Sequence, residues 1–268
     1  MPDKKKLTVT RLRKMKQEHT PIVMLTAYDA PTARLADLCG VDMLLVGDSV
    51  GMAVLGYDNT LAVTLEQSLH HCAAVKRGAP DSFIVGDMPF MTYQISPEQA
   101  LANAARYIQE AHCDAIKLEG NREIAPTVHR LTAAGVPVMG HIGLRPQQCL
   151  VEGGYKIAGK TESAAEALFN DARAMQEAGA FAIVLECVPA KLAKEISESL
   201  DIPTIGIGAG AGCDGQVQVV NDILGLFTDF IPKHAKRYAN LSAEIQRAFT
   251  EYVDDVRNRR FPTDANSF

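Results

Sequence analysis

The sequence predicts an α/β fold, a (β/α)8 TIM-type barrel with an extra N-terminal helix. Short apolar runs bounded by Gly, Pro or Asp alternate along the chain with longer stretches of helical periodicity. This alternation is typical of a parallel sheet covered by helices. The apolar runs reach the eight that a closed barrel needs. The 268 residues, 47% of them hydrophobic, are enough to bury the core of one such domain.

The predicted strands are short, and Gly, Pro or polar residues flank them. In chain order they cover residues 22–26, 43–46, 83–85, 115–118, 138–140, 182–185, 204–207 and 216–220. The eighth strand has the weakest pattern. Because little chain separates it from the seventh, the helix expected between them is the hardest to place.

The predicted helices carry recognisable signals at their ends. They cover residues 30–39, 65–77, 97–111, 124–134, 162–178 and 190–200. Ser96 followed by Pro97 is typical of an N-cap and a first helical position. Gly40, Gly135 and Gly179 each follow a predicted helix, at the position where a left-handed residue often ends it.

We expect a single barrel domain over residues 1–258, because no tandem repeat or linker divides the chain. A helix over residues 8–17 precedes the first strand and is expected to close the amino-terminal mouth of the barrel. Residues 259–268 are polar, with Pro and Asn, and are expected to form a flexible C-terminal tail.

Composition and charge narrow the possible functions. The net charge of −5 gives no electrostatic reason to expect nucleic acid, whose backbone is bound by clustered Lys and Arg. Charged residues interrupt the N-terminal stretch, so no signal peptide is predicted, and no apolar run has membrane-spanning length. The six cysteines form no C-x-x-C pair, which favours free thiols in a reducing cytoplasm. We expect a cytoplasmic protein with small-molecule partners and without nucleic-acid or membrane partners.

Polar residues follow the second and third predicted strands. Asp48 and Ser49 follow the second strand, and Asp87 follows the third. In a barrel of this class, the carboxyl ends of the strands carry the chemistry. Two carboxylates on neighbouring strands can converge on a hard cation such as Mg²⁺. The alternative is that these residues serve as turn or N-cap residues.

Lys117 and Glu119 alternate around Leu118, so their side chains are expected on the same face of the fourth strand. A functional interpretation makes Lys117 the cation for a substrate carboxylate, with Glu119 as an acid beside it. The alternative is an internal ion pair, because buried charges are normally paired.

His141 and Glu186 lie at the ends of the fifth and sixth strands. Glu186 ends a very apolar run, where partial burial would favour a role as general base. The alternative is a Glu on an exposed loop edge. A lone His is more often a structural residue than a catalytic one, but the place of His141 at a strand end leaves the two alternatives balanced.

Eight sequence blocks connect these strand ends to a known family. The blocks are TAYDAPTARLAD, VDMLLVGDSVGMAVLGYDNTL, GDMPFMTYQISPEQAL, AIKLEG, PVMGHIGLRPQ, GGYKIAGK, AGAFAIVLECVP and IPTIGIGAGAGCDGQV. In this order they resemble the ketopantoate hydroxymethyltransferase family, over about residues 9–238. Such a collinear series is not expected by chance.

The resemblance implies a barrel like those of phosphoenolpyruvate mutase and isocitrate lyase. It also implies transfer of a hydroxymethyl group from 5,10-methylenetetrahydrofolate to 3-methyl-2-oxobutanoate, which gives 2-dehydropantoate for pantothenate synthesis. The cofactor would be Mg²⁺, which would stabilise the enolate formed when a base removes the C3 proton. The family further implies a large homo-oligomer, commonly a decamer.

The resemblance assigns the metal site to three carboxylates. Asp48 and Asp87 would bind Mg²⁺ and contact the substrate, and Glu119 would contact the metal through water.

The remaining roles fall on four other residues. Ser49 and Lys117 would hold the carboxylate of the 2-oxo acid. Glu186 would be the base, and His141 would contact the substrate beside the new hydroxymethyl group.

The chain departs from the family pattern at Arg145, Gln218 and His234, of which Arg145 bears on the folate side. One rival interpretation is a carbon–carbon lyase or phosphonate mutase of the related barrels. The loop that holds Cys149 resembles the hydroxymethyltransferase loop instead of the reactive Cys loop of the lyases. A second rival is a non-catalytic barrel that binds metabolites or partners. Ionisable residues at successive strand ends argue against it.

Overall fold

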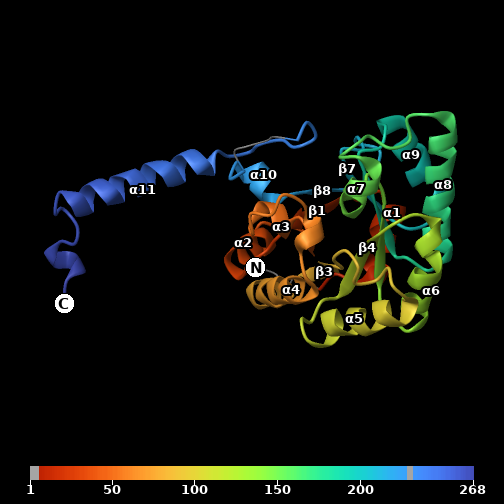
Figure 1. The fold of residues 1–268 in the computed structure, drawn as a ribbon, viewed down its shortest axis with the longest axis horizontal. Helices are drawn as coiled ribbons and strands as arrows, with labels where there is room; N and C mark the ends of the chain where they lie inside the picture. Colours follow the sequence, from red (N-terminus) through yellow and green to blue (C-terminus); the bar gives the residue numbers. More distant parts are fainter. Residues whose placement is uncertain (1–5, 228–231) are drawn as a thin grey trace. The chain divides into compact units, whose positions relative to one another are not determined.

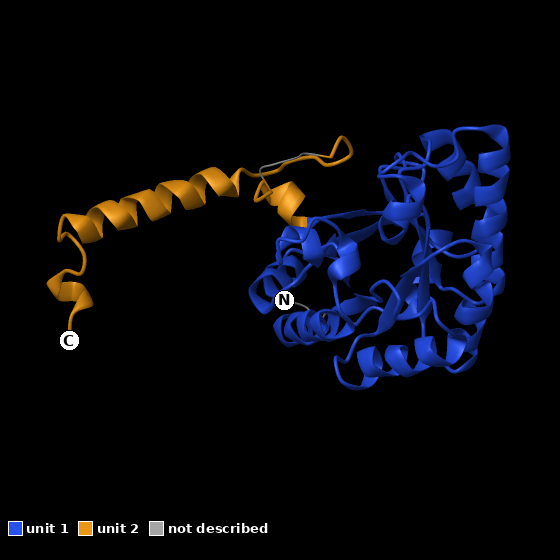
Figure 2. Cartoon of the chain, viewed as in Figure 1, with its two compact units in different colours: residues 1–219 blue, residues 220–268 orange. Residues whose placement is uncertain are grey.

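The computed structural model describes residues 6–227 and 232–268. The chain forms two compact units, residues 1–219 and residues 220–268 (Figure 2). Residues 1–5 and 228–231 belong to the predicted 1–258 domain but lie outside the described residues. The expected domain boundary at residue 258 stays a prediction.

Unit 1 is a closed barrel of parallel strands, which confirms the predicted fold class (Figure 1). The strands follow one another around the barrel in chain order, and β1 pairs with β8 to close it. In the described residues the strands are β1 Ile22–Thr26, β2 Met43–Val46, β3 Phe83–Asp87, β4 Ala115–Glu119, β5 Val138–Gly143, β6 Ala182–Glu186, β7 Thr204–Ile207 and β8 Gly215–Gln218.

The helices of unit 1 agree with the predicted ones to within two residues at each end. They are α1 Val9–Gln17, α2 Ala30–Leu38, α4 Leu65–Gly78, α5 Pro97–Gln109, α6 Ala125–Ala133, α8 Glu162–Glu177 and α9 Ala190–Ser199. The Ser96 side chain accepts a hydrogen bond from the Gln99 N–H and caps α5 as expected. Gly135 and Gly179 have φ angles of 89° and 96°, the left-handed conformation predicted after α6 and α8.

Several short helices lie in the loops after the strands and were not predicted. They are α3 Val50–Ala53, η1 Thr60–Ala62, η2 Arg122–Ile124, η3 Pro146–Gln148 and α7 Cys149–Glu152. Segments of three or four residues are too short for a periodic pattern to reveal them.

Strands β3, β4, β5 and β6 extend one to three residues beyond their predicted ends. The prediction stopped where the apolar run stopped, but the pairing continues into polar residues. Asp87 pairs with Lys117, and Glu119 pairs with His141. Glu186 likewise ends β6 and pairs with Gly143, so five expected site residues belong to the strands, whose pairing fixes their positions.

The eighth strand is shorter than predicted and starts one residue earlier. It covers Gly215–Gln218, because β1 and β7 offer pairing partners only to these residues. Val220, expected in this strand, instead begins helix α10. Residues 208–214, between β7 and β8, form turns and bends without a helix.

Helix α1 closes the amino-terminal end of the barrel, as predicted. Its Leu12 and Met15 side chains are buried and join the apolar cluster inside the barrel. Lys16 Nζ donates to the Ser197 carbonyl at 2.8 Å and to Asp214 Oδ2 at 2.7 Å. A larger apolar cluster lies between the strands and the surrounding helices. The barrel interior below the strand ends is therefore a packed apolar floor.

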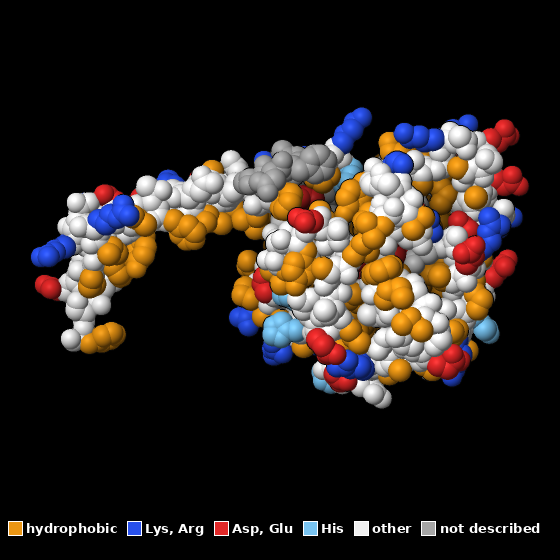
Figure 3. Space-filling model, viewed as in Figure 1, with side chains coloured by type: hydrophobic (Ala, Val, Ile, Leu, Met, Phe, Trp, Pro, Cys, Tyr) orange, Lys and Arg blue, Asp and Glu red, His pale blue; other side chains and the backbone are white. Residues whose placement is uncertain are grey.

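Unit 2 contains α10 Val220–Leu224, α11 Leu241–Arg257 and the short turn η4 Asp264–Asn266. Helix α11 was not predicted, although apolar residues recur along it at helical spacing. The large apolar residues of α11 are 38–67% exposed, and Figure 3 shows hydrophobic side chains along it. They are Ile245, Phe249, Tyr252, Val253 and Val256. The flexibility expected of residues 259–268 stays a prediction.

Two expectations about the chain as a whole can be compared with the described structure. All six cysteines are free thiols, as predicted. Of the helices in residues 6–227 and 232–268, none combines the length and apolar character needed to cross a membrane.

The packing behind β3 predicts a sharp difference between two strand glycines. A Cβ on Gly86 would lie 2.4 Å from Cδ1 of the buried Tyr107, whereas a Cβ on Gly140 would lie 3.4 Å from Cγ of Met175. We expect Gly86→Ala to destabilise the protein by about 1–3 kcal/mol through overpacking, because Tyr107 must move. Gly140→Ala is the matched control and should be close to neutral. Urea unfolding measures both, and equal midpoints for the two variants would contradict this packing.

Candidate active site

The expected site residues meet at the carboxyl end of the barrel, on its inner face. Strand pairing sets Asp87 beside Lys117 and Glu119 beside His141. Glu186 ends β6 and pairs with Gly143 on β5. Parallel strands in register bring these polar ends to one level, as the sequence predicted.

Three carboxylates lie buried in this cluster. The exposed fractions of Asp48, Asp87 and Glu119 are 5%, 1% and 3%. The Asp48 backbone N–H donates to Asp87 Oδ2 at 3.1 Å, which ties the loop after β2 to β3. Burial, followed by the charge of Asp87, raises the pKa of Asp48 to about 7. Burial also raises the pKa of Glu119 well above its usual range. Burial is the largest cause of both shifts, and neighbouring carboxylates add to it.

Lys117 supplies positive charge within the cluster. Its Nζ lies 2.6 Å from Asp87 Oδ1 and 3.4 Å from His141 Nδ1. Burial alone would lower the pKa of Lys117, but the Asp87 and Glu119 carboxylates outweigh burial and raise it above its usual value. Lys117 therefore stays charged. The internal ion pair considered from the sequence exists, although its acidic partner is Asp87 instead of Glu119.

His141 connects Lys117 to Glu186. Its Nε2 lies 3.3 Å from Glu186 Oε2. Burial, followed by the nearby charge of Lys117, lowers the pKa of His141, so the imidazole is neutral. Because the Lys117 ammonium can only donate, Nδ1 is assigned as the acceptor and Nε2 as the N–H that faces Glu186. The Glu186 side chain is 18% exposed, so it is accessible to a substrate.

Ser49 occupies the N-cap position of α3, but its side chain makes no capping hydrogen bond. Its Oγ lies instead 2.7 Å from the hydroxyl of the buried Tyr28. The Ser49 hydroxyl therefore does not cap the helix, which was the alternative considered from the sequence. Tyr28 was not predicted as a site residue.

Two further residues of the cluster were missed from the sequence. Gln147 is 3% exposed, and its Nε2 donates to Asp48 Oδ2 at 2.9 Å. The Tyr93 hydroxyl lies 2.8 Å from both the Glu119 carbonyl and Gln147 Oε1. Neither residue is charged at neutral pH, and neither ends a strand. The search for ionisable groups at strand ends therefore passed over them.

The donor set suits a hard cation. In the part of the chain that the structure describes, no group of three or more His, Cys, Asp or Glu residues is close enough to hold an ion. Asp48 and Asp87 are nevertheless adjacent, and Glu119 Oε1 is buried without a hydrogen-bond partner among the described residues. Mg²⁺ typically binds one or two carboxylates and keeps several waters. Two carboxylates with a third within reach of a bound water fit that mode.

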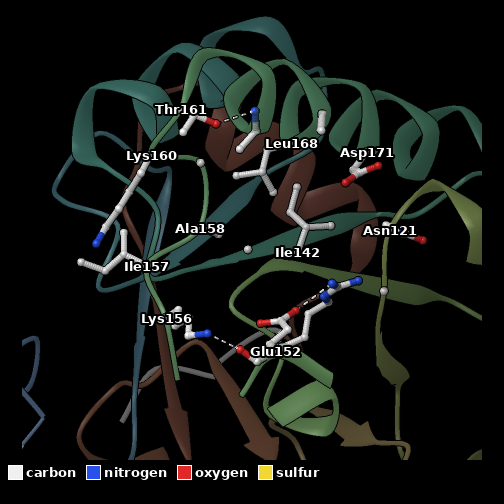
Figure 4. A pocket seen from close by; sticks show the side chains of 16 residues that line it. Asn121, Ile142, Glu152, Lys156, Ile157, Ala158, Lys160, Thr161, Leu168 and Asp171 are labelled. Carbon is white, nitrogen blue, oxygen red and sulfur yellow. Dashed lines mark hydrogen bonds and ion pairs between the residues drawn. The ribbon is translucent and has the colours of Figure 1, made fainter. Parts of the chain in front are cut away.

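A cavity of about 460 Å³ lies beside the strand ends, between β5 and α8 (Figure 4). Ile142 and Leu168 line it, and an ion pair joins Arg145 Nη2 to Glu152 Oε1 at 2.8 Å. Lys156 Nζ donates to the Glu152 carbonyl at 2.6 Å. In the described structure none of the predicted site residues lines this cavity. Arg145, the departure from the family pattern, therefore lies outside the carboxylate cluster.

Sequence comparisons find similar proteins along nearly the whole chain. The family model of ketopantoate hydroxymethyltransferase matches residues 6–264. A 3-methyl-2-oxobutanoate hydroxymethyltransferase of Dehalococcoides mccartyi (strain ATCC BAA-2266 / KCTC 15142 / 195) is 56% identical over 97% of this chain and 93% of that protein. A protein of the same name from Syntrophus aciditrophicus (strain SB) is 54% identical over 98% of this chain and 97% of that protein.

Solved structures with the same fold are more distant in sequence. Phosphonopyruvate hydrolase in complex with oxalate and Mg²⁺ has a TM-score of 0.62 at 13% identity, covering 97% of this chain and 93% of that chain. The 2,3-dimethylmalate lyase, a PEP mutase/isocitrate lyase superfamily member, has a TM-score of 0.59 at 15% identity, covering 97% and 91%. The expected likeness to these barrels is confirmed at the level of the fold.

The buried ion pair predicts the effect of removing Lys117. Lys117→Met keeps the length of the side chain but leaves Asp87 buried without its ammonium partner. We expect the metal-free protein to lose about 3–5 kcal/mol, the usual effect of breaking a buried pair. Urea unfolding in EDTA measures the loss. Lys191→Met is the control, because that side chain is 92% exposed and its pair with Glu195 should contribute less than about 1 kcal/mol. Equal effects of the two substitutions would argue against the pair.

Proposed function

The chain belongs to the ketopantoate hydroxymethyltransferase family, and on that premise we propose that it moves a hydroxymethyl group from 5,10-methylenetetrahydrofolate to 3-methyl-2-oxobutanoate. The product is 2-dehydropantoate, for pantothenate synthesis. The observation that carries this proposal is the meeting of a carboxylate cluster, a charged lysine and an accessible glutamate at the carboxyl end of the barrel.

We assign the cofactor site to the carboxylate cluster. Asp48 and Asp87 hold Mg²⁺, and Glu119 contacts it through water. When bound, Mg²⁺ supplies a Lewis acid that stabilises negative charge developing on the 2-oxo acid. The buried and unpartnered Glu119 Oε1 supports this assignment, as does the raised pKa of Asp48 caused by burial and Asp87.

Ser49 and Lys117 hold the carboxylate of the 2-oxo acid. The ammonium of Lys117 stays charged inside the barrel, where an ion pair with a substrate carboxylate is stronger than in water. The Ser49 hydroxyl makes no capping hydrogen bond, and its contact with the Tyr28 hydroxyl orients it. Together they fix the substrate so that its C3 faces the end of β6, and such fixing lowers the barrier to reaction.

Glu186 removes the proton at C3, and the resulting carbon nucleophile forms a bond to the methylene carbon of the folate donor. Over the whole reaction both carbon–nitrogen bonds of that methylene group break, water supplies the oxygen of the new hydroxyl, and tetrahydrofolate leaves with its nitrogens protonated. The carboxylate of Glu186 is accessible, and Nε2 of the neutral imidazole of His141 lies 3.3 Å from its Oε2. A neutral imidazole at this distance places no counter-charge beside the Glu186 carboxylate. His141 is also placed to contact the new hydroxymethyl group.

A cytoplasmic location and a homodecameric assembly belong to the same proposal. The exposed apolar side chains of α11, among them Phe249 at 67% and Tyr252 at 58%, support self-association, because isolated apolar helices of this kind normally become covered. Sedimentation velocity at micromolar concentration measures the assembly directly.

A turnover assay tests the proposed reaction. The purified chain with Mg²⁺, 3-methyl-2-oxobutanoate and 5,10-methylenetetrahydrofolate should form 2-dehydropantoate, detected by mass spectrometry. Folate omission should abolish the product. Absence of product in the complete mixture, with cleavage of 2,3-dimethylmalate or of a phosphonate instead, would favour the rival lyase or mutase activity.

The metal assignment predicts that Asp87→Asn weakens metal binding and turnover together. The amide keeps the shape of the side chain but loses the charge that attracts Mg²⁺. We expect the dissociation constant for Mg²⁺ to rise by at least about 10-fold, as for residues that support metal sites. Isothermal calorimetry measures it, and Asp81→Asn on the exposed turn before β3 is the control. Unchanged metal affinity in Asp87→Asn would exclude Asp87 as a ligand.

The base assignment predicts that Glu186→Gln keeps metal and substrate binding but loses about 10²- to 10⁴-fold in turnover, the usual contribution of a positioned base. Deuterium incorporation at C3 of the oxo acid in D₂O, followed by NMR at saturating Mg²⁺, should fall in parallel. If exchange continued at the wild-type rate in the variant, another group would have to remove the proton.

A further inference from the structure

Gln147 enters the carboxylate cluster from a loop instead of a strand. It lies in η3, the turn between β5 and α7, and its side chain is almost completely buried. Burying a carboxamide is unfavourable unless its donors and acceptor are all satisfied. The bonds that satisfy it therefore indicate what it does.

Both donor positions of the Gln147 amide are directed at acceptors. Nε2 donates to Asp48 Oδ2 at 2.9 Å and to the Met88 carbonyl at 3.0 Å. Asp48 follows β2 and Met88 follows β3, so one amide group joins the loops of two neighbouring strands. A bond to one Asp48 oxygen leaves the other oxygen for a cation.

The acceptor of the same amide is fixed from the opposite side. Gln147 Oε1 lies 2.8 Å from the Tyr93 hydroxyl and 3.1 Å from Gln94 Nε2. An amide flipped by 180° would direct Oε1 at the Asp48 carboxylate, where two acceptors would face each other. The neighbours therefore permit one orientation, in which the N–H groups face Asp48.

The backbone of Gln147 reaches a second carboxylate. Its N–H donates to Glu119 Oε2 at 3.3 Å, whereas Glu119 Oε1 has no partner among the described residues. One residue thus contacts Asp48 through its side chain and Glu119 through its main chain. These are two of the three carboxylates assigned to the metal.

We propose that Gln147 is a positioning residue of the metal centre, which holds Asp48 and Glu119 in the arrangement that receives the cation. This inference rests on the proposed function. Buried carboxylates repel one another, and without a donor between them they would turn apart. A neutral amide holds them by hydrogen bonds without neutralising their charge, so the attraction for the cation is retained. Groups that orient metal ligands in this way typically contribute 10–100-fold to metal affinity.

The test compares Gln147→Met with Gln148→Met in the full-length protein. Methionine matches the volume of glutamine but makes no strong hydrogen bond, so a residue that only fills space would tolerate it. Gln148 is the next residue of the same turn and is partly exposed. We expect calorimetry with Mg²⁺ alone to give a dissociation constant about 10–100-fold higher for Gln147→Met and within about twofold of wild type for Gln148→Met.

A split in the kinetics separates positioning from a general folding defect. The Mg²⁺ concentration for half-maximal turnover should rise in Gln147→Met. The decrease in kcat at saturating Mg²⁺ should be smaller than this rise, and the melting temperature should change little. Wild-type Mg²⁺ affinity in Gln147→Met would overturn the proposal. A wild-type chain that binds Mg²⁺ but forms no product would refute the proposed reaction instead.

Tyr93→Phe gives a second, milder test that keeps the ring in place. Loss of the hydroxyl releases Gln147 Oε1 and should weaken Mg²⁺ binding by less than Gln147→Met does. In the double variant the combined effect should be smaller than the sum of the two, because Tyr93 and Gln147 share a hydrogen bond. Full additivity would overturn the proposed connection. If Gln147→Met fails to fold, an unchanged Mg²⁺ affinity in Tyr93→Phe would overturn the proposal by itself.

Discussion

Like charges buried at the carboxyl end of the barrel are the constraint on which the rest of the site depends. Asp48, Asp87 and Glu119 are almost completely buried and share the ammonium of Lys117. Burying a carboxylate without compensation costs several kcal/mol, so such a cluster persists only where the surrounding structure holds it. The compensation here is incomplete, because burial still raises the pKa values of Asp48 and Glu119. A divalent cation would complete it.

The barrel supplies the rigidity that this arrangement needs. Strand pairing extends into the charged residues, so the Cα positions of Asp87, Lys117 and Glu119 are set by the same ladder that forms the core. Below them the interior is apolar and is closed by Leu12 and Met15 of α1. The carboxylates therefore cannot relieve their mutual repulsion by moving deeper into the barrel, because the interior there is packed with apolar side chains. Neighbouring residues at the same level of the barrel must instead stabilise the charges.

Much of the fold and the charged part of the site could be predicted from the sequence, because both are written in local patterns. The alternation of apolar runs with helical stretches predicted the strands, and the ionisable residues at some strand ends predicted Asp87 and Glu186. Gln147 and Tyr93 could not be found in this way. They are uncharged, and their role arises from contacts between residues 54 apart in the chain, which no local pattern encodes. The residues by which β3, β4, β5 and β6 exceed their predicted ends were missed for a related reason. Their hydrogen bonds to neighbouring strands continue past the point where the apolar run stops.

Several uncharged side chains contact the polar groups of this site. Gln147 contacts Asp48, Tyr28 contacts Ser49, and neutral His141 faces Glu186. A second lysine or arginine in place of Gln147 or His141 would set a counter-charge beside Asp48 or Glu186. A neutral hydrogen-bond donor restricts orientation while leaving the charge available to a cation or a proton. Lys117 is placed beside Asp87, and its charge adds to burial in lowering the pKa of His141. One ammonium thus acts on two neighbours, on Asp87 through the ion pair and on His141 through its charge.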